Sequence, residues 1–165
     1  MWQDNGFMKD GITDTKAAMR ELEALMPFVR KKYESFSSDE LLQPPAPGKW
    51  SRQQVLGHLI DSAVNNLKRF TDAQFLDKPY MIIGYKQDDL MQVNNYQQLP
   101  LQHLLTLWQA LNQQIIFVVM NIPADKLAFE VQPQYNQTGT QTLAWLICDY
   151  VAHMEHHLRA MSLLD

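Results

Sequence analysis

Four segments of the sequence repeat apolar residues at intervals of three and four, and this periodicity restricts the fold more than any other feature. The segments span about residues 13–36, 51–76, 100–123 and 140–164. Such spacing places apolar side chains along one face of an α-helix. Proline, glycine and polar residues separate the segments, as is typical of helix ends and loops. Four long amphipathic helices without convincing strands predict an all-α protein, a four-helix bundle with long interhelical connections.

Local signals mark where these helices begin or bend. Ser51 and Gln54 form a capping box at the start of the second segment. Pro100 suits the first turn of the third segment, and Thr140 is the expected N-cap of the fourth. Pro27 lies inside the first segment, where it predicts a kink or a division into two helices.

The connections differ in composition. In the first connection, residues 37–50, the proline-rich run 44–48 predicts extended backbone. The second connection, residues 77–99, is long, and residues 88–91 are expected to form a short helical turn inside it. A polar loop is expected at residues 135–139, before the last helix.

Length and composition limit the class of protein. The 165 residues predict a single domain, residues 1–165 with a core of about 13–164. A net charge of -4 argues against a nucleic-acid partner, and no apolar stretch reaches the ~20 residues that span a membrane. The first residues lack the pattern of a secretory signal, and a lone cysteine, Cys148, suits a reducing compartment. We therefore expect a cytoplasmic protein that binds neither nucleic acid nor membranes.

Three histidines lie close together in the last helical segment, and helical geometry separates them. His153 and His157 fall in the apolar stripe four residues apart, so both rings project from one face. His156 falls on the opposite face with Glu155 and Arg159, where exposure to solvent is expected. Burying two imidazoles without partners costs ~1–3 kcal/mol for each unpaired group, and a metal ion resolves this. A helical pair of this spacing is a recurrent zinc-binding geometry.

Two histidines at this spacing, without a third candidate ligand, are more often core residues with hydrogen-bond partners than metal ligands. A further candidate, His58, lies at the edge of the apolar arc of the second helical segment. Polar residues on the same edge line a pocket between helices or form an ordinary solvated boundary, and periodicity leaves both interpretations open. With a tyrosine one turn before His153, the candidate pocket residues are Ser62, Asn65, Arg69 and Tyr150.

Other ionisable residues carry weaker signals. His103 lies outside the apolar stripe and is expected to be exposed, whereas Cys148 is expected to be a small buried side chain. Asp61 and Asp149 have the chemistry to orient metal-bound imidazoles, but surface exposure is expected for each. The sequence contains no glycine-rich phosphate loop, no CxxC pattern and no GxSxG motif.

Two stretches resemble motifs of the DinB/YfiT-like superfamily. Residues 47–62, PGKWSRQQVLGHLIDS, resemble its second-helix motif, and residues 150–158, YVAHMEHHL, resemble its fourth-helix motif. The resemblance extends over about residues 13–164. It implies a four-helix bundle that binds one divalent metal ion, usually zinc or nickel, through one histidine of the second helix and two of the last. By motif position the implied ligands are His58, His153 and His157.

The resemblance also implies enzymatic activity. Members of the superfamily are described as metal-dependent hydrolases, or are similar to S-transferases that use bacillithiol or related low-molecular-weight thiols, or to the mycothiol-dependent isomerase. Members are often dimers, so we expect a homodimer with a small-molecule substrate.

Three protein ligands leave a coordination position for water or substrate, as in catalytic sites. Metal coordination acidifies water for the hydrolysis of small esters or amides, and acidifies a thiol for transfer to small electrophiles. The sequence offers no convincing general base beside the histidines, which favours a thiol S-transferase, since a thiolate needs no base. The alternatives are a metal-dependent hydrolase, a non-catalytic metal-binding domain and a domain whose histidines bind no metal.

Overall fold

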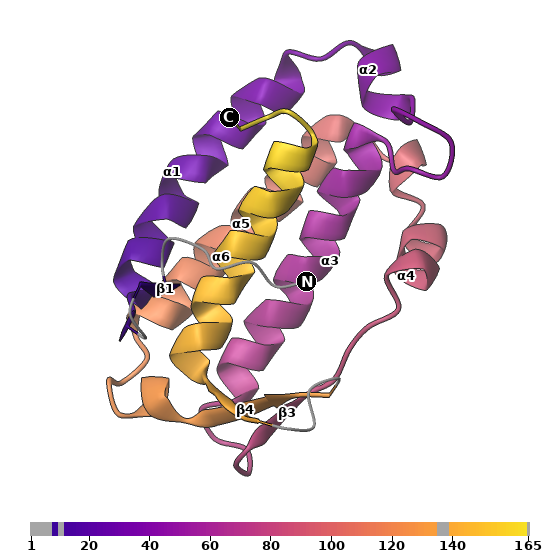
Figure 1. Cartoon of the computed structure of the whole chain (residues 1–165). Coiled ribbons are helices and arrows are strands. Elements are labelled where there is room, and N and C mark those ends of the chain that lie inside the picture. The colour runs from indigo at the N-terminus through magenta and orange to yellow at the C-terminus, as the bar shows by residue number, and fades with distance from the viewer. Residues whose placement is uncertain (1–7, 10–11, 135–138, 165) are drawn as a thin grey trace.

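Four long helices form the body of the protein in the computed structural model, which describes residues 8–9, 12–134 and 139–164 (Figure 1). The bundle helices are α1 (Thr15–Glu34), α3 (Arg52–Asp72), α5 (Leu101–Met120) and α6 (Leu143–Ala160). The connections carry the short helices α2 (Ser38–Leu42) and α4 (Gln87–Asn94) and the 3-10 turns η1 (Tyr96–Gln98) and η2 (Lys126–Ala128). The predicted all-α four-helix bundle is confirmed.

The direction of the helices explains the long second connection. In Figure 1, α1 and α6 run upward and α3 and α5 run downward, so the successive long helices α3 and α5 are parallel neighbours. A short turn joins only antiparallel neighbours. Residues 73–100 therefore return along the outside of the bundle to the upper end, and they carry α4 and η1 on the way.

Short strands close the lower end of the bundle. Strand β3 (Tyr80–Ile82) pairs in parallel with β4 (Glu130–Pro133), which pairs antiparallel with β5 (Gln141–Thr142). A separate antiparallel pair joins β1 (Met8–Lys9) and β2 (Ile12–Thr13). The expectation of a protein without strands is wrong in this respect. Strands of two to four residues are too short to show the apolar–polar alternation by which strands are recognised.

The helix boundaries follow most of the predicted signals. Ser51 caps α3 with the expected capping box. Helix α1 is continuous through Pro27, so the division into two helices is not found. The last helix begins later than expected, because Thr142 is its N-cap in place of Thr140: the Thr142 hydroxyl accepts from the Trp145 amide at 3.1 Å.

The connections are more helical than expected. Helix α2 lies inside the first connection, although the proline-rich run after it is not helical. The predicted turn at residues 88–91 is part of α4, which is eight residues long. The predicted polar loop before the last helix falls mostly on residues 135–138, which lie outside the described part of the chain.

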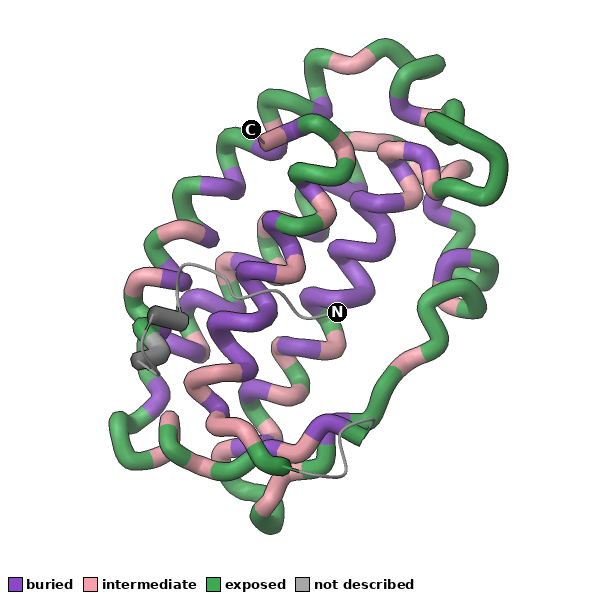
Figure 2. The backbone as a smooth tube through the Cα atoms, in the orientation of Figure 1, coloured by how far each residue is buried: buried purple, intermediate pink, exposed green. Residues whose placement is uncertain are grey.

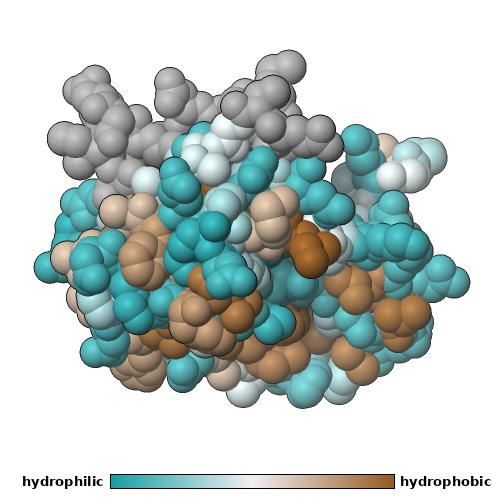
Figure 3. Space-filling view, turned by 90° about the horizontal axis from the view of Figure 1, so that it is seen from below, coloured by the Kyte–Doolittle hydropathy of each residue, from teal (hydrophilic) through white to brown (hydrophobic). Residues whose placement is uncertain are grey.

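The facing sides of the four long helices form the core (Figure 2). Trp108, Tyr33 and Tyr150 are among its largest fully buried side chains. At the lower end, apolar side chains reach the surface in patches separated by polar ones (Figure 3). Among the described helices, none combines the length and the apolar character needed to cross a membrane.

Candidate metal centre and adjoining cavity

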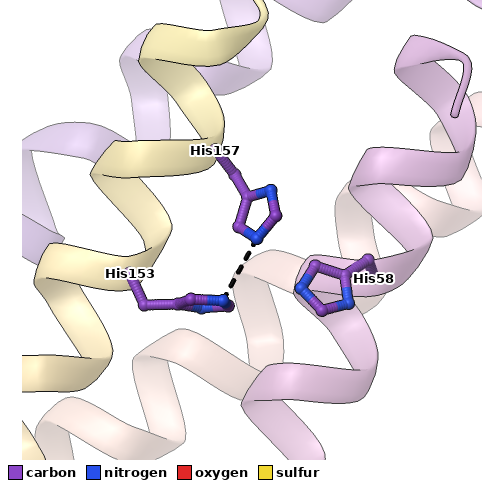
Figure 4. Close-up of side chains that lie close together, drawn as sticks. All are labelled: His58, His153 and His157. Atoms are coloured by element: carbon purple, nitrogen blue, oxygen red, sulfur yellow. Dashed lines mark hydrogen bonds between the residues drawn. The ribbon is translucent and has the colours of Figure 1, made fainter. Parts of the chain in front are cut away.

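Three histidines from two helices converge inside the bundle (Figure 4). His58 projects from α3, and His153 and His157 project from α6; one ring nitrogen of each lies within 4.8 Å of those of the other two. The Nε2 atoms of His153 and His157 are 3.1 Å apart. The ring centroid of His58 lies 4.6 Å from that of His157 and 5.4 Å from that of His153. The structure thus brings together the three residues that the motifs indicated.

Helical phase explains which histidines take part. His153 and His157 lie one turn apart on the side of α6 that faces α3 (Figure 4), whereas His156 is exposed. His58 is 1% exposed, and the Trp50 ring packs against it with 5.1 Å between ring centroids. His103, on α5, is exposed as predicted. Both exposed histidines are outside the cluster.

Burial keeps the three clustered imidazoles neutral. The pKa of each of His58, His153 and His157 is lowered to about 4, mainly because burial disfavours the charged ring and further because histidines repel one another when protonated. Each ring therefore presents a lone pair at neutral pH. His153 and His157 can satisfy one ring nitrogen each through their mutual hydrogen bond.

The donor set fits a divalent metal ion. The Nε2 atom of His58 is buried and has no hydrogen-bond partner in the described structure, and an unsatisfied buried polar atom costs about 1–3 kcal/mol. If the three histidines were ordinary core residues with hydrogen-bond partners, this Nε2 atom would not be left without one. Three neutral imidazoles are suited to ions such as Zn²⁺ and Ni²⁺, and a bound ion would satisfy His58.

A cavity of about 190 Å³ adjoins the histidine cluster. It lies between α3, α6 and the segment that follows β3, and His153 forms part of its wall. Its other lining residues are Ser62, Asn66, Arg69, Ile82, Gly84, Tyr85, Gln87, Pro133, Trp145, Leu146, Asp149 and Tyr150. A molecule in this cavity would therefore lie beside the candidate metal centre.

The predicted pocket residues differ in their position. Ser62, Arg69 and Tyr150 line the cavity, whereas Asn65 is not among the lining residues and its amide donates to the Asp61 carbonyl at 2.8 Å. Asn66 lines the cavity in its place. One residue changes the direction of a helical side chain by about 100°, which is the precision that separates these two neighbours.

Two of these residues are held by neighbours of the cavity. The Arg69 guanidinium donates to the Ile83 carbonyl at 2.7 Å and lies 5.6 Å from the centroid of the Tyr85 ring, which ties α3 to the segment after β3. The Tyr150 hydroxyl donates to Asn112 Oδ1 at 2.6 Å. Burial raises the pKa of Tyr150, so its hydroxyl stays protonated.

Three acidic residues expected at the surface are buried. Asp61 is 7% exposed, Glu155 is 8% exposed and Asp149 is 9% exposed. The returning connection covers Asp61, whose carboxylate accepts hydrogen bonds from Tyr96 Oη at 2.6 Å and from Asn94 at 3.0 Å. The Glu155 carboxylate pairs with Arg159 at 3.0 Å. Helical periodicity alone does not show which faces the connections cover.

Asp149 matters most for function, because its side chain lines the cavity one turn before His153. Burial raises the pKa of this carboxyl to about 7, and the positive charge of Arg69 acts in the opposite direction. A buried carboxyl of raised pKa therefore lines the cavity near the histidines, where the sequence offered no convincing general base. The signal in the sequence is the four-residue spacing from Asp149 to His153, which places both on one face of α6.

Known proteins resemble this chain in sequence. Residues 28–161 match the DinB superfamily. A "Putative metal-dependent hydrolase" of Bacillus cereus (strain 03BB102) is 26% identical over 139 residues, which cover 84% of this chain and 78% of the relative. A protein of the same description from Bacillus thuringiensis subsp. konkukian (strain 97-27) has the same identity and coverage.

Two solved structures share the fold. YfiT from Bacillus subtilis, described as "a probable metal-dependent hydrolase with an unusual four-helix bundle topology", has a TM-score of 0.82 at 18% identity and covers 98% of this chain and 90% of its own. The mycothiol-dependent maleylpyruvate isomerase has a TM-score of 0.64 at 12% identity, over 88% of this chain and 60% of its own. With the family match spanning both histidine-bearing helices, this chain is a member of the DinB superfamily.

Proposed function

We propose that this chain is a metal-dependent hydrolase of small esters or amides that binds one zinc or nickel ion through His58, His153 and His157. The observation that carries the proposal is that the neutral three-histidine cluster adjoins the cavity through His153. Structural zinc sites are closed by four protein ligands, whereas catalytic sites combine three protein ligands with an open position. Three protein ligands beside a cavity support the second arrangement.

The protein residues would hold the ion and shape the space beside it. When bound, a divalent ion supplies positive charge that acidifies a coordinated water or thiol and polarises a substrate. His58, nearly inaccessible to solvent, and the α6 pair fix the position of the site. Ile82, Leu146 and Trp145 give the cavity an apolar side that fits the carbon part of a small substrate.

The choice of hydrolysis over thiol transfer depends on Asp149. The sequence favoured thiol transfer because no general base was recognised, and the buried carboxyl beside His153 removes that reason. Hydrolysis is also consistent with the descriptions of the Bacillus relatives and of YfiT, which share the family or the fold of this chain.

Thiol S-transfer, of the type that uses bacillithiol, is the second candidate, and Arg69 favours it. A guanidinium in the cavity wall suits a co-substrate with an anionic group, such as the carboxylate of a cysteine-derived thiol. The thiol would lose its proton to solvent, its sulfur would bond to a carbon of a small electrophile, and the leaving group on that carbon would depart with the electron pair of its bond. The residues that line the cavity are compatible with water or with a thiol as nucleophile. An experiment therefore distinguishes hydrolysis from thiol transfer.

The test compares zinc- or nickel-loaded protein with protein treated with a chelator. We expect cleavage of p-nitrophenyl esters without added thiol, loss of cleavage after chelation, and recovery when the ion is restored. His156→Ala serves as the control for His153→Ala, since both change a histidine of α6. Conjugation of monochlorobimane to a thiol, without ester cleavage, would show that the protein is a thiol transferase and not a hydrolase. Bound metal without either reaction would favour a non-catalytic domain.

A further inference from the structure

Asp149 is a buried carboxyl whose partner is not supplied by the described part of the protein. Its side chain is 9% exposed and lines the cavity. No described residue donates a hydrogen bond to it or forms an ion pair with it. This distinguishes it from Asp61, which Tyr96 and Asn94 satisfy. A carboxyl in this environment needs a proton or a donor, and the cavity is where a ligand would provide one.

The groups around Asp149 come from three parts of the fold. Arg69 of α3 and Tyr85, after β3, line the same cavity, and Tyr150 and His153 line it from α6 itself. Arg69 is the cation among them, and its charge favours the ionised carboxylate, while burial favours the protonated form. These opposing effects leave the carboxyl able to exchange a proton near neutral pH.

We infer that Asp149 is a catalytic residue of this site, a general base that takes the proton of the attacking nucleophile and returns it to the leaving group. The inference rests on the proposed hydrolase function. It gives the site a group that can carry a proton. The three neutral imidazoles cannot do so as ligands, because ligand histidines use their lone pairs to hold the ion.

The proton balance in ester hydrolysis is complete with this residue. The oxygen of a water molecule forms a bond to the ester carbonyl carbon, and a proton of that water passes to the Asp149 carboxylate. The bond between the carbonyl carbon and the leaving oxygen then breaks with its electron pair. The leaving oxygen takes the proton from Asp149, which restores the carboxylate and yields one acid and one alcohol.

The position and the acidity of Asp149 both suit a general base. One helical turn separates it from His153, so a reacting group near that histidine lies within reach of the carboxyl across the cavity. A carboxyl with a pKa of about 7 is half ionised at neutral pH, where an ordinary aspartate is too weak a base to accept a proton efficiently. Geometry and acidity therefore agree.

The kinetic test is Asp149→Asn, which removes the proton carrier and keeps the size of the side chain. We expect metal content to stay at the wild-type value while kcat for ester cleavage falls at least about 100-fold, as is usual for the loss of a general base. The acidic limb of the wild-type kcat profile should disappear. A variant that retains both kcat and this limb would overturn the inference.

Asp61→Asn is the matched control, because Asp61 is as buried but bonds to the returning connection and lies outside the cavity. It should keep the position of the acidic limb. A shift of that limb in Asp61→Asn alone would overturn the assignment to Asp149.

A second measurement does not depend on turnover. The infrared carbonyl band of a protonated carboxyl, assigned by its absence in Asp149→Asn, should titrate near pH 7 in the metal-free wild-type protein. Titration near pH 4 would overturn the role of Asp149 even if the protein were an active metalloenzyme. Conversely, a wild-type protein that binds no metal would contradict the proposed function, and the infrared titration would still decide whether Asp149 exchanges protons near neutral pH.

Discussion

The Nε2 atoms of His153 and His157 lie 3.1 Å apart on successive turns of α6. Without a bound ion, two ring nitrogens this close must share a hydrogen bond in which one carries a proton and the other presents a lone pair, so at most one of the two rings is charged. His58 faces both rings from α3, and its Nε2 atom has no partner in the described structure. A shared metal ion would use all three lone pairs, which the hydrogen bond alone does not.

The pH dependence of stability is a first prediction for the metal-free protein. The pKa of His58, His153 and His157 is about 4 in the folded state, below the value of about 6.5 expected when unfolded. Between these values the unfolded chain binds more protons, so acidification from pH 6.5 to 4 should lower the free energy of unfolding. Urea titrations at several pH values measure this.

Asp149 opposes that trend and provides the control. Its pKa is about 7 when folded and lower when unfolded, so acidification through this range favours the folded state. Metal-free Asp149→Asn should therefore lose stability more steeply between pH 6.5 and 4 than the wild type. Equal slopes for the two proteins would show that Asp149 has an ordinary acidity.

Gly57 is the subject of the second prediction. A Cβ atom at this position would lie 2.2 Å from Cδ2 of Tyr96, because the tyrosine side chain packs directly against α3 here. Gly57→Ala should displace the ring and lower the free energy of unfolding by about 1–3 kcal/mol, as overpacking does. Gly139→Ala, where no atom of the described residues lies within 4 Å of the added atom, is the control and should change the free energy of unfolding by less than about 0.5 kcal/mol. Similar values for both variants would contradict the packing described.

The Tyr96 hydroxyl supports the third prediction. It donates to Asp61 at 2.6 Å and so fastens the returning connection to α3. Tyr96→Phe leaves a buried carboxylate with one donor fewer and should cost about 1–3 kcal/mol. Tyr80→Phe is the control, since the Tyr80 hydroxyl has no hydrogen bond within the described structure, and should cost much less. A double-mutant cycle with Asp61→Asn should recover most of the cost as coupling.

Part of this architecture could be predicted from the sequence because helical phase is a local property. The phase of the last helix separates His153 and His157 from His156 without knowledge of any neighbour. The convergence of His58 is not local: it depends on α3 and α6 being antiparallel neighbours, and only the resemblance to the superfamily indicated it.

The unexpected burial of Asp61 and Asp149 has a common cause in the connections. The returning segment covers Asp61, and the segment after β3 encloses the cavity beside Asp149, so both carboxyls are buried despite their polar character. Burial by an irregular segment leaves no periodic signal in a single sequence. The missed strands at the lower end of the bundle are likewise too short for periodicity.

The metal content of protein purified without a histidine tag tests the central claim most directly. Elemental analysis should find about one equivalent of zinc or nickel in the wild type and in His156→Ala, and less than about a tenth of an equivalent in His58→Ala and His153→Ala, since each of these removes one of three ligands. Wild-type protein with less than a tenth of an equivalent after growth and dialysis with either ion, or equal metal content in all four proteins, would contradict the account.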